Sequence, residues 1–448
     1  MSASAPDPLA PAGRSPGRPV ARPVARPVAR LVARTVEIDD PGPLLGLLPP
    51  GAAPLSWVRR GEGLVGWGEA ARLRTSGPGR FSAAERGWRR LVAGAVVRDD
   101  VGLRGTGPVA FGSFAFADGS PTASALVVPA TAVGHRDGRW WLTRTTLGEA
   151  GPSTGATIPG AVAEAPPQQP APGPPGTVRF ADGAMSSPDW ELLVARAVAR
   201  VEHGELDKVV LARDLRARTE EPVDPRGLLQ RLAAAYPSTW TFGVDGLVGA
   251  TPEMLVRTQV RLVASRVLAG TIRRSGDDAH DLSLVASLAR SSKDLGEHEY
   301  AVRSVVEALT PFCAGTNVPE SPFVLHLANV MHLATDVTGV LRDDVSSLRL
   351  AEALHPSAAV CGTPTAAAAA LIDQVEGMDR GRYAGPVGWL DASGDSEWGI
   401  ALRCGQVQED AHEVRLFAGC GIVAGSDPTA ELAESAAKFV PMRDALGG

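Results

Sequence analysis

The part of the sequence that decides the fold lies near the C-terminus and reads Leu416-Phe417-Ala418-Gly419-Cys420-Gly421-Ile422-Val423. It predicts a strand that begins near Val414, and its glycines let the backbone turn and approach another group closely. A few residues further on, Asp427 is a good N-cap and Pro428 suits the first helical position. We therefore expect a strand, a glycine-containing turn and a helix that ends near Val440.

The expected helix carries charged residues on one face. Glu431, Glu434 and Lys438 stand at positions i, i+3 and i+7, so two carboxylates and an amine point the same way. Such a face beside a glycine turn can hold a metal ion and an anion. A solvated charged face on a surface helix gives the same pattern, and this stretch alone leaves both interpretations open.

Length and composition describe a globular chain. Its 448 residues are 44% hydrophobic and 21% charged, enough for two ordinary domains or one large one. The net charge of −6 argues against a nucleic-acid partner. The four cysteines lack metal-ligand spacing and predict reduced thiols in a cytoplasmic protein. No apolar run approaches the roughly 20 residues that span a bilayer, so we expect no membrane contact.

Two segments are of low complexity. Residues 1–34 contain an Arg-Pro-Val-Ala repeat, whose prolines would break a helix at every turn, and predict a disordered basic tail. Residues 149–177 are rich in Pro, Gly and Ala and predict a loop or linker. This second segment can be a domain boundary or a long surface loop within one fold.

The rest of the chain alternates between strand and helix patterns. From about Val36 to Arg144, short strand-like runs between turns predict an antiparallel sheet, with one helical candidate at 82–96. Beyond the second low-complexity segment, apolar periodicity predicts helices at 187–202 and 282–309. Strand patterns recur at 206–213, 262–269, 330–337, 383–390 and 397–404.

Four polar residues in the second half have two interpretations each. Lys208 stands among valines: inside a buried strand it can act as a base, whereas on an edge strand it faces water. Glu253, held behind a proline, is a general acid or a turn carboxylate. Arg403, expected on a strand, can grip a carboxylate or be solvated. His332, in another strand, is a hydrogen-bonded core group, a ligand or a base.

These motifs together resemble one family. The matching segments occur in family order between about residues 187 and 440: 206–213, 250–253, 268–270, 293–299, 332–335, 355–364, 379–389, 397–404 and 416–438. The chain is similar to the chorismate-utilising enzymes, which include isochorismate synthase, salicylate synthase and anthranilate synthase component I. The resemblance implies an α+β fold of two large, mostly antiparallel β-sheets packed as a sandwich, with helices outside. It also implies that residues 35–448 form a single chorismate-binding domain, with 149–177 as an internal loop.

The resemblance assigns roles to individual residues. Glu297 and Glu434 look like ligands of Mg²⁺, and Glu431 contributes through water or outer contacts. The groups that match the substrate-binding positions of the family are Gly270, His332, Tyr383, Arg403, Gly419, Gly421 and Lys438. Lys208 matches the base that activates water for attack at ring carbon C2, and Glu253 matches the acid that protonates the departing C4 hydroxyl.

The resemblance also separates members of the family. The lysine at 208 points to isochorismate or salicylate formation rather than amine addition, and Ala359 stands where salicylate synthases usually have threonine. We therefore expect an isochorismate synthase feeding menaquinone or siderophore biosynthesis, with a salicylate synthase as the alternative. A non-catalytic chorismate-binding homologue is the alternative of another class. No Leu-Leu-Glu-Ser motif is present, so we expect no amidotransferase subunit, and the resemblance implies a monomer, as is usual among the isochorismate and salicylate synthases of the family.

Overall fold

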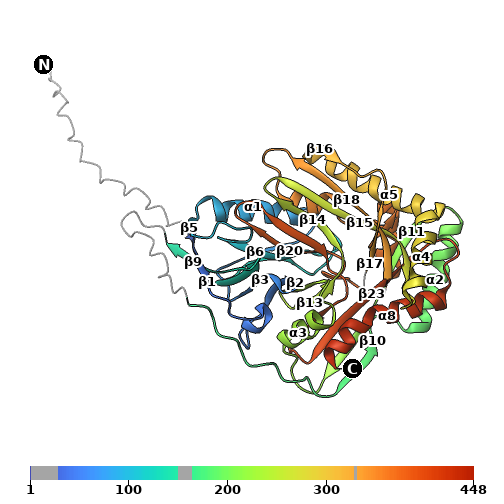
Figure 1. Cartoon of the computed structure of the whole chain (residues 1–448), viewed down its shortest axis with the longest axis horizontal. Coiled ribbons are helices and arrows are strands. Elements are labelled where there is room, and N and C mark those ends of the chain that lie inside the picture. Colours follow the sequence, from blue (N-terminus) through green and yellow to red (C-terminus); the bar gives the residue numbers. More distant parts are fainter. Residues whose placement is uncertain (2–28, 150–163, 327–329, 448) are drawn as a thin grey trace.

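Strands from the whole length of the chain combine in two large sheets (Figure 1). The computed structural model describes Met1 and residues 29–149, 164–326 and 330–447. The strands of the first sheet, sheet A, are β1 (Ala29–Ile38), β2 (Leu55–Arg59), β3 (Glu62–Trp67), β5 (Val96–Asp99), β8 (Thr131–Arg136), β9 (Arg139–Glu149), β10 (Val178–Asp182), β11 (Lys208–Thr219), β12 (Trp240–Val244), β13 (Leu247–Thr251), β19 (Gly362–Thr363), β22 (Cys404–Val407) and β23 (Glu413–Ile422). Their spatial order is β10-β11-β23-β22-β13-β12-β2-β3-β8-β9-β1-β5, with β19 beside β11.

The second sheet, sheet B, also combines strands from distant parts of the chain. Its strands are β4 (Ala71–Thr75), β6 (Val109–Ser113), β7 (Ser124–Val128), β14 (Met254–Gln259), β15 (Leu262–Arg273), β16 (Cys313–Asn317), β17 (Phe323–His326), β18 (Val330–Leu341), β20 (Pro386–Asp391) and β21 (Ser396–Ile400). The order is β16-β18-β15-β14-β21-β20-β6-β7-β4, with β17 beside β18. Among the described strands only β1 and β5 pair in parallel, so the mostly antiparallel sandwich expected from the sequence is confirmed.

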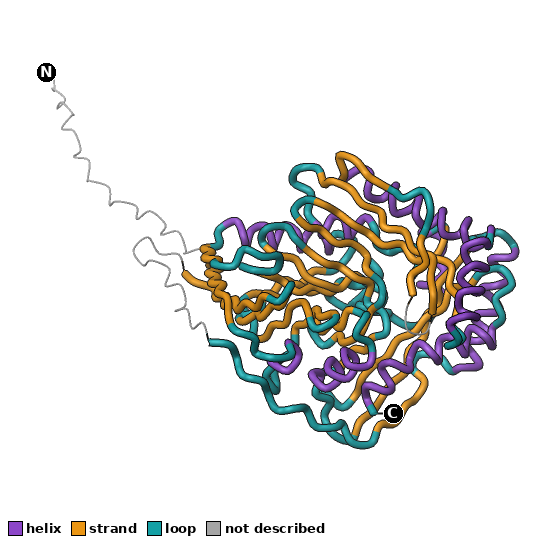
Figure 2. Tube along the Cα trace, viewed as in Figure 1, coloured by secondary structure: helices purple, strands orange, loops and turns teal. Residues whose placement is uncertain are grey.

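Helices cover the outside of the sheets (Figure 2). They are α1 (Arg80–Ala93), α2 (Ser187–Glu202), α3 (Pro225–Ala235), α4 (Asp278–Arg290), α5 (Ser292–Leu309), α6 (Ser347–Ala353), α7 (Thr365–Val375) and α8 (Pro428–Leu446), with short 3-10 turns η1 (Leu44–Leu47) and η2 (Thr310–Phe312). Helix α5 packs on β15 and β18, and α8 packs on β23. No helix in the described part of the chain is both long and apolar enough to cross a membrane.

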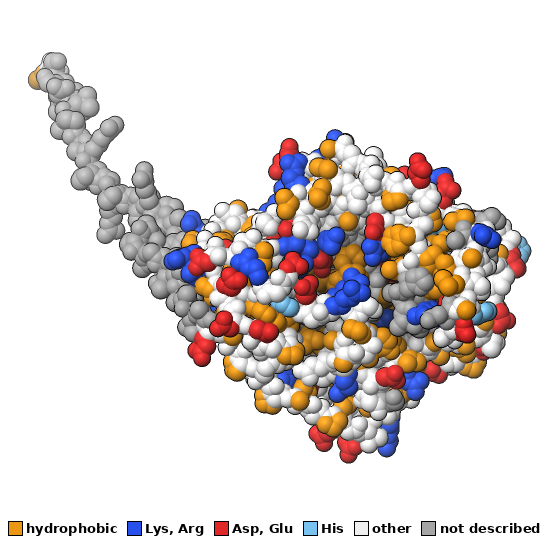
Figure 3. All heavy atoms as spheres, in the orientation of Figure 1, with side chains coloured by type: hydrophobic (Ala, Val, Ile, Leu, Met, Phe, Trp, Pro, Cys, Tyr) orange, Lys and Arg blue, Asp and Glu red, His pale blue; other side chains and the backbone are white. Residues whose placement is uncertain are grey.

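The core lies between the two sheets. Buried aromatic residues from both sheets meet there, among them Trp57, Trp141 and Phe242 from sheet A and Phe111, Trp389 and Trp398 from sheet B. A second apolar cluster lies under α3, α8 and η1. Seen from outside, the face in Figure 3 is hollowed near its centre, with apolar side chains inside the hollow and Lys or Arg side chains at its border.

Local signals in the sequence predict several element boundaries well. Helix α2 has the bounds 187–202 that its periodicity indicates, since Ser186 caps it by accepting a hydrogen bond from the Asp189 amide. Asp427 caps α8 in the same way, through the Ala430 amide. This helix continues past Val440 because its last turns are buried against the second cluster.

Two predicted boundaries are wrong. The tail does not extend to residue 34, because β1 begins at Ala29 and buries Leu31, Val32 and Ala33; residues 2–28 lie outside the described part of the chain. The predicted helix over 282–309 is two helices, α4 and α5. Ser291, a residue type preferred at helix starts, stands at the break, and its carbonyl accepts the amide of Leu295.

The Pro- and Gly-rich segment is described only from residue 164 onward. There it runs without regular structure past η1, where Gln168 donates to the carbonyls of Pro41 and Pro43. Strands from before and after it pair directly, β2 with β12 and β6 with β20. This pairing supports the interpretation of an internal loop in one domain, which we keep as a proposal.

Candidate active site

The floor of the candidate site is formed by β11 and β23, which pair antiparallel. A Cβ atom at Gly421 would lie 2.9 Å from Cε of Lys208. A Cβ atom at Gly419 would lie 3.1 Å from the hydroxyl of Tyr383 and 2.9 Å from a backbone oxygen. A larger residue at either position would displace its neighbour. The two glycines thus leave room for an amine and a phenol directly over the sheet.

Lys208 lies on an internal part of sheet A. Its strand pairs with β23 on one side, and Lys208 itself pairs with Thr363 of β19 on the other. The interpretation of an edge strand is therefore wrong at this position. The lysine side chain is partly buried and lies over Gly421.

Helix α8 supplies the charged wall of the site. Lys438 Nζ donates to the carbonyl oxygen of Gly419 at 2.8 Å and forms an ion pair with Glu434 at 2.7 Å. The lysine therefore joins the helix to the glycine strand. This arrangement contradicts the interpretation of α8 as a merely solvated charged face.

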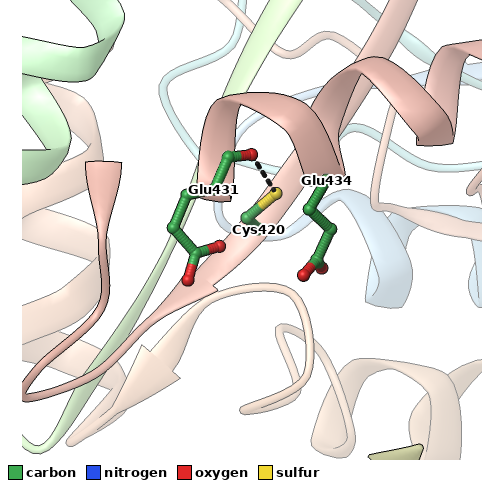
Figure 4. A group of neighbouring side chains, drawn as sticks. All are labelled: Cys420, Glu431 and Glu434. Carbon is green, nitrogen blue, oxygen red and sulfur yellow. Dashed lines mark hydrogen bonds between the residues drawn. The ribbon is translucent and has the colours of Figure 1, made fainter. Parts of the chain in front are cut away.

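Glu431 and Glu434 form a group that fits a divalent cation. With the Cys420 thiol they offer ligand atoms that all lie within 4.8 Å of one another (Figure 4). Burial raises the pKa of Glu431, Ser426 donates to its carboxylate at 2.9 Å and partly offsets this, and the nearby Glu434 raises the pKa further. A cation would relieve this repulsion.

The donor set favours a hard ion. Two carboxylates are the oxygen ligands that Mg²⁺ takes, together with waters. Burial raises the pKa of the Cys420 thiol to about 12, and the thiol donates to the backbone oxygen of Glu431 at 3.4 Å. The sulfur thus remains protonated, which suits a site that binds through oxygen.

Glu253 and Arg403 lie where the chain crosses between the sheets. Glu253 connects β13 of sheet A to β14 of sheet B, and Arg403 connects β21 of sheet B to β22 of sheet A. The two crossings are bonded together: the Ile400 amide donates to the Glu253 carbonyl at 3.1 Å, and the Ala250 amide donates to the Arg403 carbonyl at 3.2 Å. The prediction that Arg403 lies on a strand is wrong, because the crossing forces it into the left-handed region at φ 49°.

The carboxyl group of Glu253 has an unusual environment. Burial raises its pKa to about 7, and the positive charges of Lys208, Lys438 and Arg403 counteract that rise. The base predicted from the sequence thus lies within electrostatic range of the predicted acid. The raised pKa favours the interpretation as a general acid, and the role of Glu253 stays a prediction.

Arg403 and Tyr383 lie near the same cluster. Burial lowers the pKa of Arg403, and the neighbouring Tyr383 and Glu434 partly restore it. Tyr383 lies in a turn before β20 rather than on a strand, and its ring stacks on Phe417 with centroids 5.1 Å apart. Burial raises the pKa of its hydroxyl, so the phenol is a hydrogen-bond donor.

Three predicted residues have backbone positions but no described side chains. Glu297 lies on α5, and His332 lies on β18 opposite Thr271. Gly270 marks a register shift in β15 between Ala269 and Thr271, a kind of irregularity frequent beside active sites. The side chains of Glu297 and His332 are outside the described part of the structure, and the roles of all three residues stay predictions.

Ala359 lies in an exposed turn just before β19. The turn is tied to the base-bearing strand, because the Val210 amide donates to the Cys361 carbonyl at 2.8 Å. Its role in selecting the product also stays a prediction.

Sequence reasoning missed one buried pair beside this turn. Glu376 and Arg380 form an ion pair with side chains only 1% and 2% exposed. Both residues follow the end of α7 at Val375 and are not helical, so their spacing along the chain gave no signal of the pair.

Comparison with known proteins identifies the family of the chain. The family described as chorismate binding enzyme matches residues 55–447. The isochorismate synthase DhbC of Bacillus subtilis is 41% identical over 271 residues, 58% of this chain and 68% of that protein. The salicylate biosynthesis isochorismate synthase of Pseudomonas aeruginosa is 35% identical over 408 residues, 88% of this chain and 84% of that protein.

A solved structure agrees with these sequence matches. The menaquinone-specific isochorismate synthase MenF of Escherichia coli superposes with a TM-score of 0.77 at 25% identity, over 94% of this chain and 95% of that one. The chain therefore belongs to the family of chorismate-binding enzymes.

Proposed function

We propose that this chain is an isochorismate synthase, which adds water at C2 of chorismate and releases the C4 hydroxyl. The observation that carries the proposal is an amine and a carboxyl group in one site, with the carboxyl pKa near 7. The three similar proteins named above are all isochorismate synthases. The Pseudomonas aeruginosa enzyme is aligned over 88% of this chain and 84% of its own length, so we assign the same activity to this chain.

Lys208 is the proposed base. Only three of the 44 basic residues in the chain are lysines, at 208, 293 and 438. Arginine stays protonated in proteins, whereas a lysine amine can lose its proton and take another from water. A chain that otherwise uses arginine thus has its lysines in the motifs of the site. At 208 this amine lies over Gly421, whose lack of a side chain leaves room for it.

Glu253 is the proposed acid. With a pKa near 7, a large fraction of its carboxyl groups carries a proton at neutral pH. That proton can go to the C4 oxygen as the C–O bond breaks, while the ring double bonds shift toward the new C2 hydroxyl. The reaction is a balanced exchange of one hydroxyl for another, so no oxidant or reductant is needed.

The carboxylates of the substrate need positive partners. Arg403 and Lys438 supply two cationic groups near Glu253, and we propose that they bind these carboxylates, with Gly419 and Gly421 as neighbouring substrate-binding positions. Glu431 and Glu434, with Glu297 as a further proposed ligand, would hold Mg²⁺. When bound, the ion supplies positive charge that neutralises a substrate carboxylate. We also propose Gly270, His332 and Tyr383 as lining residues.

The proposal extends to the setting of the enzyme. Four buried free thiols, at Cys313, Cys361, Cys404 and Cys420, fit a reducing cytoplasm. We further propose a monomer that acts without an amidotransferase subunit. Whether its product enters a menaquinone or a siderophore pathway is left to its genetic context.

A quenched reaction of purified protein, chorismate and magnesium tests the function. Chromatography should detect isochorismate in a reversible mixture with chorismate. Salicylate and pyruvate rising in step with chorismate loss would instead make the chain a salicylate synthase. Chorismate binding without turnover would favour the non-catalytic homologue.

A further inference from the structure

Strand β11 has an interruption on one side. Away from β23, it pairs with β19 at Lys208 and Val209, and with β10 only from Leu215 onward. The backbone groups of Val210 and Ala212 face the interval between these two strands. In a sheet interior such donors and acceptors need partners, because leaving them unpaired costs stability.

Two side chains take the place of the missing strand. The carboxylate of Glu376 accepts the amide of Ala212 at 2.7 Å, and the guanidinium of Arg380 donates to the carbonyl of Val210 at 2.7 Å. Arg380 Nε also donates to Glu376 at 2.8 Å, so the two side chains are fixed to each other. Together they continue the hydrogen-bonding ladder of β11 with side-chain atoms.

The same arginine holds the turn that carries Ala359. A second guanidinium nitrogen of Arg380 donates to the carbonyl of Val360 at 2.8 Å. The guanidinium also lies over the ring of Phe116, 4.4 Å from its centroid. The planar guanidinium has five N–H donors and binds both carbonyls and the Glu376 carboxylate together, whereas a lysine has three donors on a single nitrogen.

We propose that Glu376 and Arg380 are positioning residues that fix Lys208 and the Ala359 turn relative to each other. The inference rests on the proposed function, because it takes Lys208 as the base. Lys208 lies two residues before Val210, and Ala359 directly precedes Val360, so both reach the pair through one or two peptide units. A displacement of about 1 Å at a reacting group can cost as much as 100-fold in rate.

The test removes both charges together. A single substitution would leave a buried charge without a partner and can unfold the chain. The double variant Glu376→Gln/Arg380→Met keeps an acceptor for the Ala212 amide and loses the bonds to both carbonyls. The matched control is Arg104→Met/Glu397→Gln, which removes another buried ion pair, with a 2.9 Å bond, from between other elements.

Two measurements separate positioning from general stability. Hydrogen exchange over 206–214 should speed up in the double variant and stay unchanged in the control. The kcat for isochorismate formation should fall more than about tenfold while KM for chorismate changes less than about threefold. The conservative variant Arg380→Lys keeps the charge, so its kcat and its exchange rates should lie between those of the double variant and the wild type.

Some outcomes would overturn the proposal. Unchanged kcat and exchange in the double variant would do so, as would an equal loss of kcat in the control. If the wild type lacked isochorismate synthase activity, the proposed function would fail instead. The exchange experiment would then still report whether the pair holds β11.

Discussion

Two lysine–glutamate pairs in this site use the same residue types for different purposes. Lys438 and Glu434 stand one turn apart on α8 and form an ion pair at 2.7 Å. Lys208 lies on β11 of sheet A and Glu253 in the crossing between the sheets, and the positive charge of the lysine only partly counteracts the burial that raises the carboxyl pKa to about 7. The first pair is a fixed set of charges, whereas the second keeps a transferable proton.

The difference shows how the fold assigns roles. An ion pair on one helix follows from local spacing alone. The other pair depends on the crossing of the chain between the sheets at Glu253, because this crossing, and not local spacing, brings the carboxyl group within electrostatic range of Lys208. Acid–base catalysis requires environments that give similar groups different pKa values.

The largest expected effect compares the two lysines directly. Lys208→Arg keeps the positive charge but removes a base, so kcat should fall about 10²–10⁴-fold or more while chorismate still binds. Lys438→Arg keeps what an ion pair needs and should lose less than about tenfold. Steady-state kinetics and a binding titration on both variants check this. Equal losses would mean that both lysines act only through charge.

The acid of the second pair should be nearly as sensitive. Glu253→Gln cannot donate a proton to the departing hydroxyl, and kcat should fall by about 10²–10⁴-fold. Glu434→Gln, tested at saturating magnesium, supplies the comparison on the ion-paired side. A loss of less than about tenfold for Glu253→Gln would return this residue to the role of a turn carboxylate.

The same substitution should stabilise the fold in alkaline solution. The pKa of Glu253 is raised from 4.5 to about 7 in the folded state, so the folded chain holds a proton that the unfolded chain releases between those values. Stability from this group therefore falls as pH rises through that window. Glu253→Gln should increase the free energy of unfolding by roughly 1–3 kcal/mol at pH 8, with little change at pH 4. Urea titrations at both pH values measure this difference.

Metal binding tests the group of charges around the Lys438–Glu434 ion pair. Chelation should abolish activity and added magnesium should restore it. Glu434→Gln and Glu431→Gln should each weaken Mn²⁺ binding, measured by electron paramagnetic resonance, by about 10–100-fold. Cys420→Ser is the matched control, because the thiol is bonded to the backbone rather than needed as a ligand. Weakened binding in this control alone would place the ion on the sulfur.

A moderate effect should appear in the pH profile. The acid must be protonated, so kcat/KM for chorismate should decline as pH rises above about 7, the pKa of Glu253 in the free enzyme. In Glu253→Gln the residual activity should lack this decline. An unchanged alkaline limb would assign the titration to another group.

Local signals account for what could be predicted from the sequence. The N-cap at Asp427 and the spacing of Glu431, Glu434 and Lys438 follow from neighbouring residues, and the structure matches them. The crossings at Glu253 and Arg403 depend on which strands pair across the sheets. That pairing is non-local, so residue patterns indicated the residue types but placed Arg403 on a strand.

The buried pair of Glu376 and Arg380 shows the same limit in another form. They follow the end of α7 outside regular structure, and only the interruption beside β11 explains why both are buried. Likewise, the periodicity of α4 continues into α5, so apolar pattern alone joined two helices. An apolar pattern shows which face of a helix is buried. It does not show where a helix breaks, or where side chains bond to a strand in place of a neighbouring strand, because both depend on contacts distant in the sequence.

The smallest expected effect concerns the product. Both isochorismate and salicylate synthases would use the Lys208–Glu253 pair for the first step, so that pair cannot distinguish them. Pyruvate leaves bound isochorismate through a step that depends mainly on the geometry in which the substrate is held. Ala359 is exposed in its turn, close along the chain to the strand that pairs with Lys208, and it offers neither a hydroxyl nor added bulk.

Ala359→Thr should therefore raise the share of chorismate that ends as salicylate and pyruvate, with kcat for isochorismate changed less than about threefold. The exposed position tolerates the larger side chain, so the fold should be unaffected. Ala358→Thr, one residue earlier in the same turn, is the matched control and should leave the product ratio unchanged. If chromatography of quenched reactions finds equal ratios in both variants, the turn acts only by holding β11, and the Lys208–Glu253 pair and its surroundings would have to select the product.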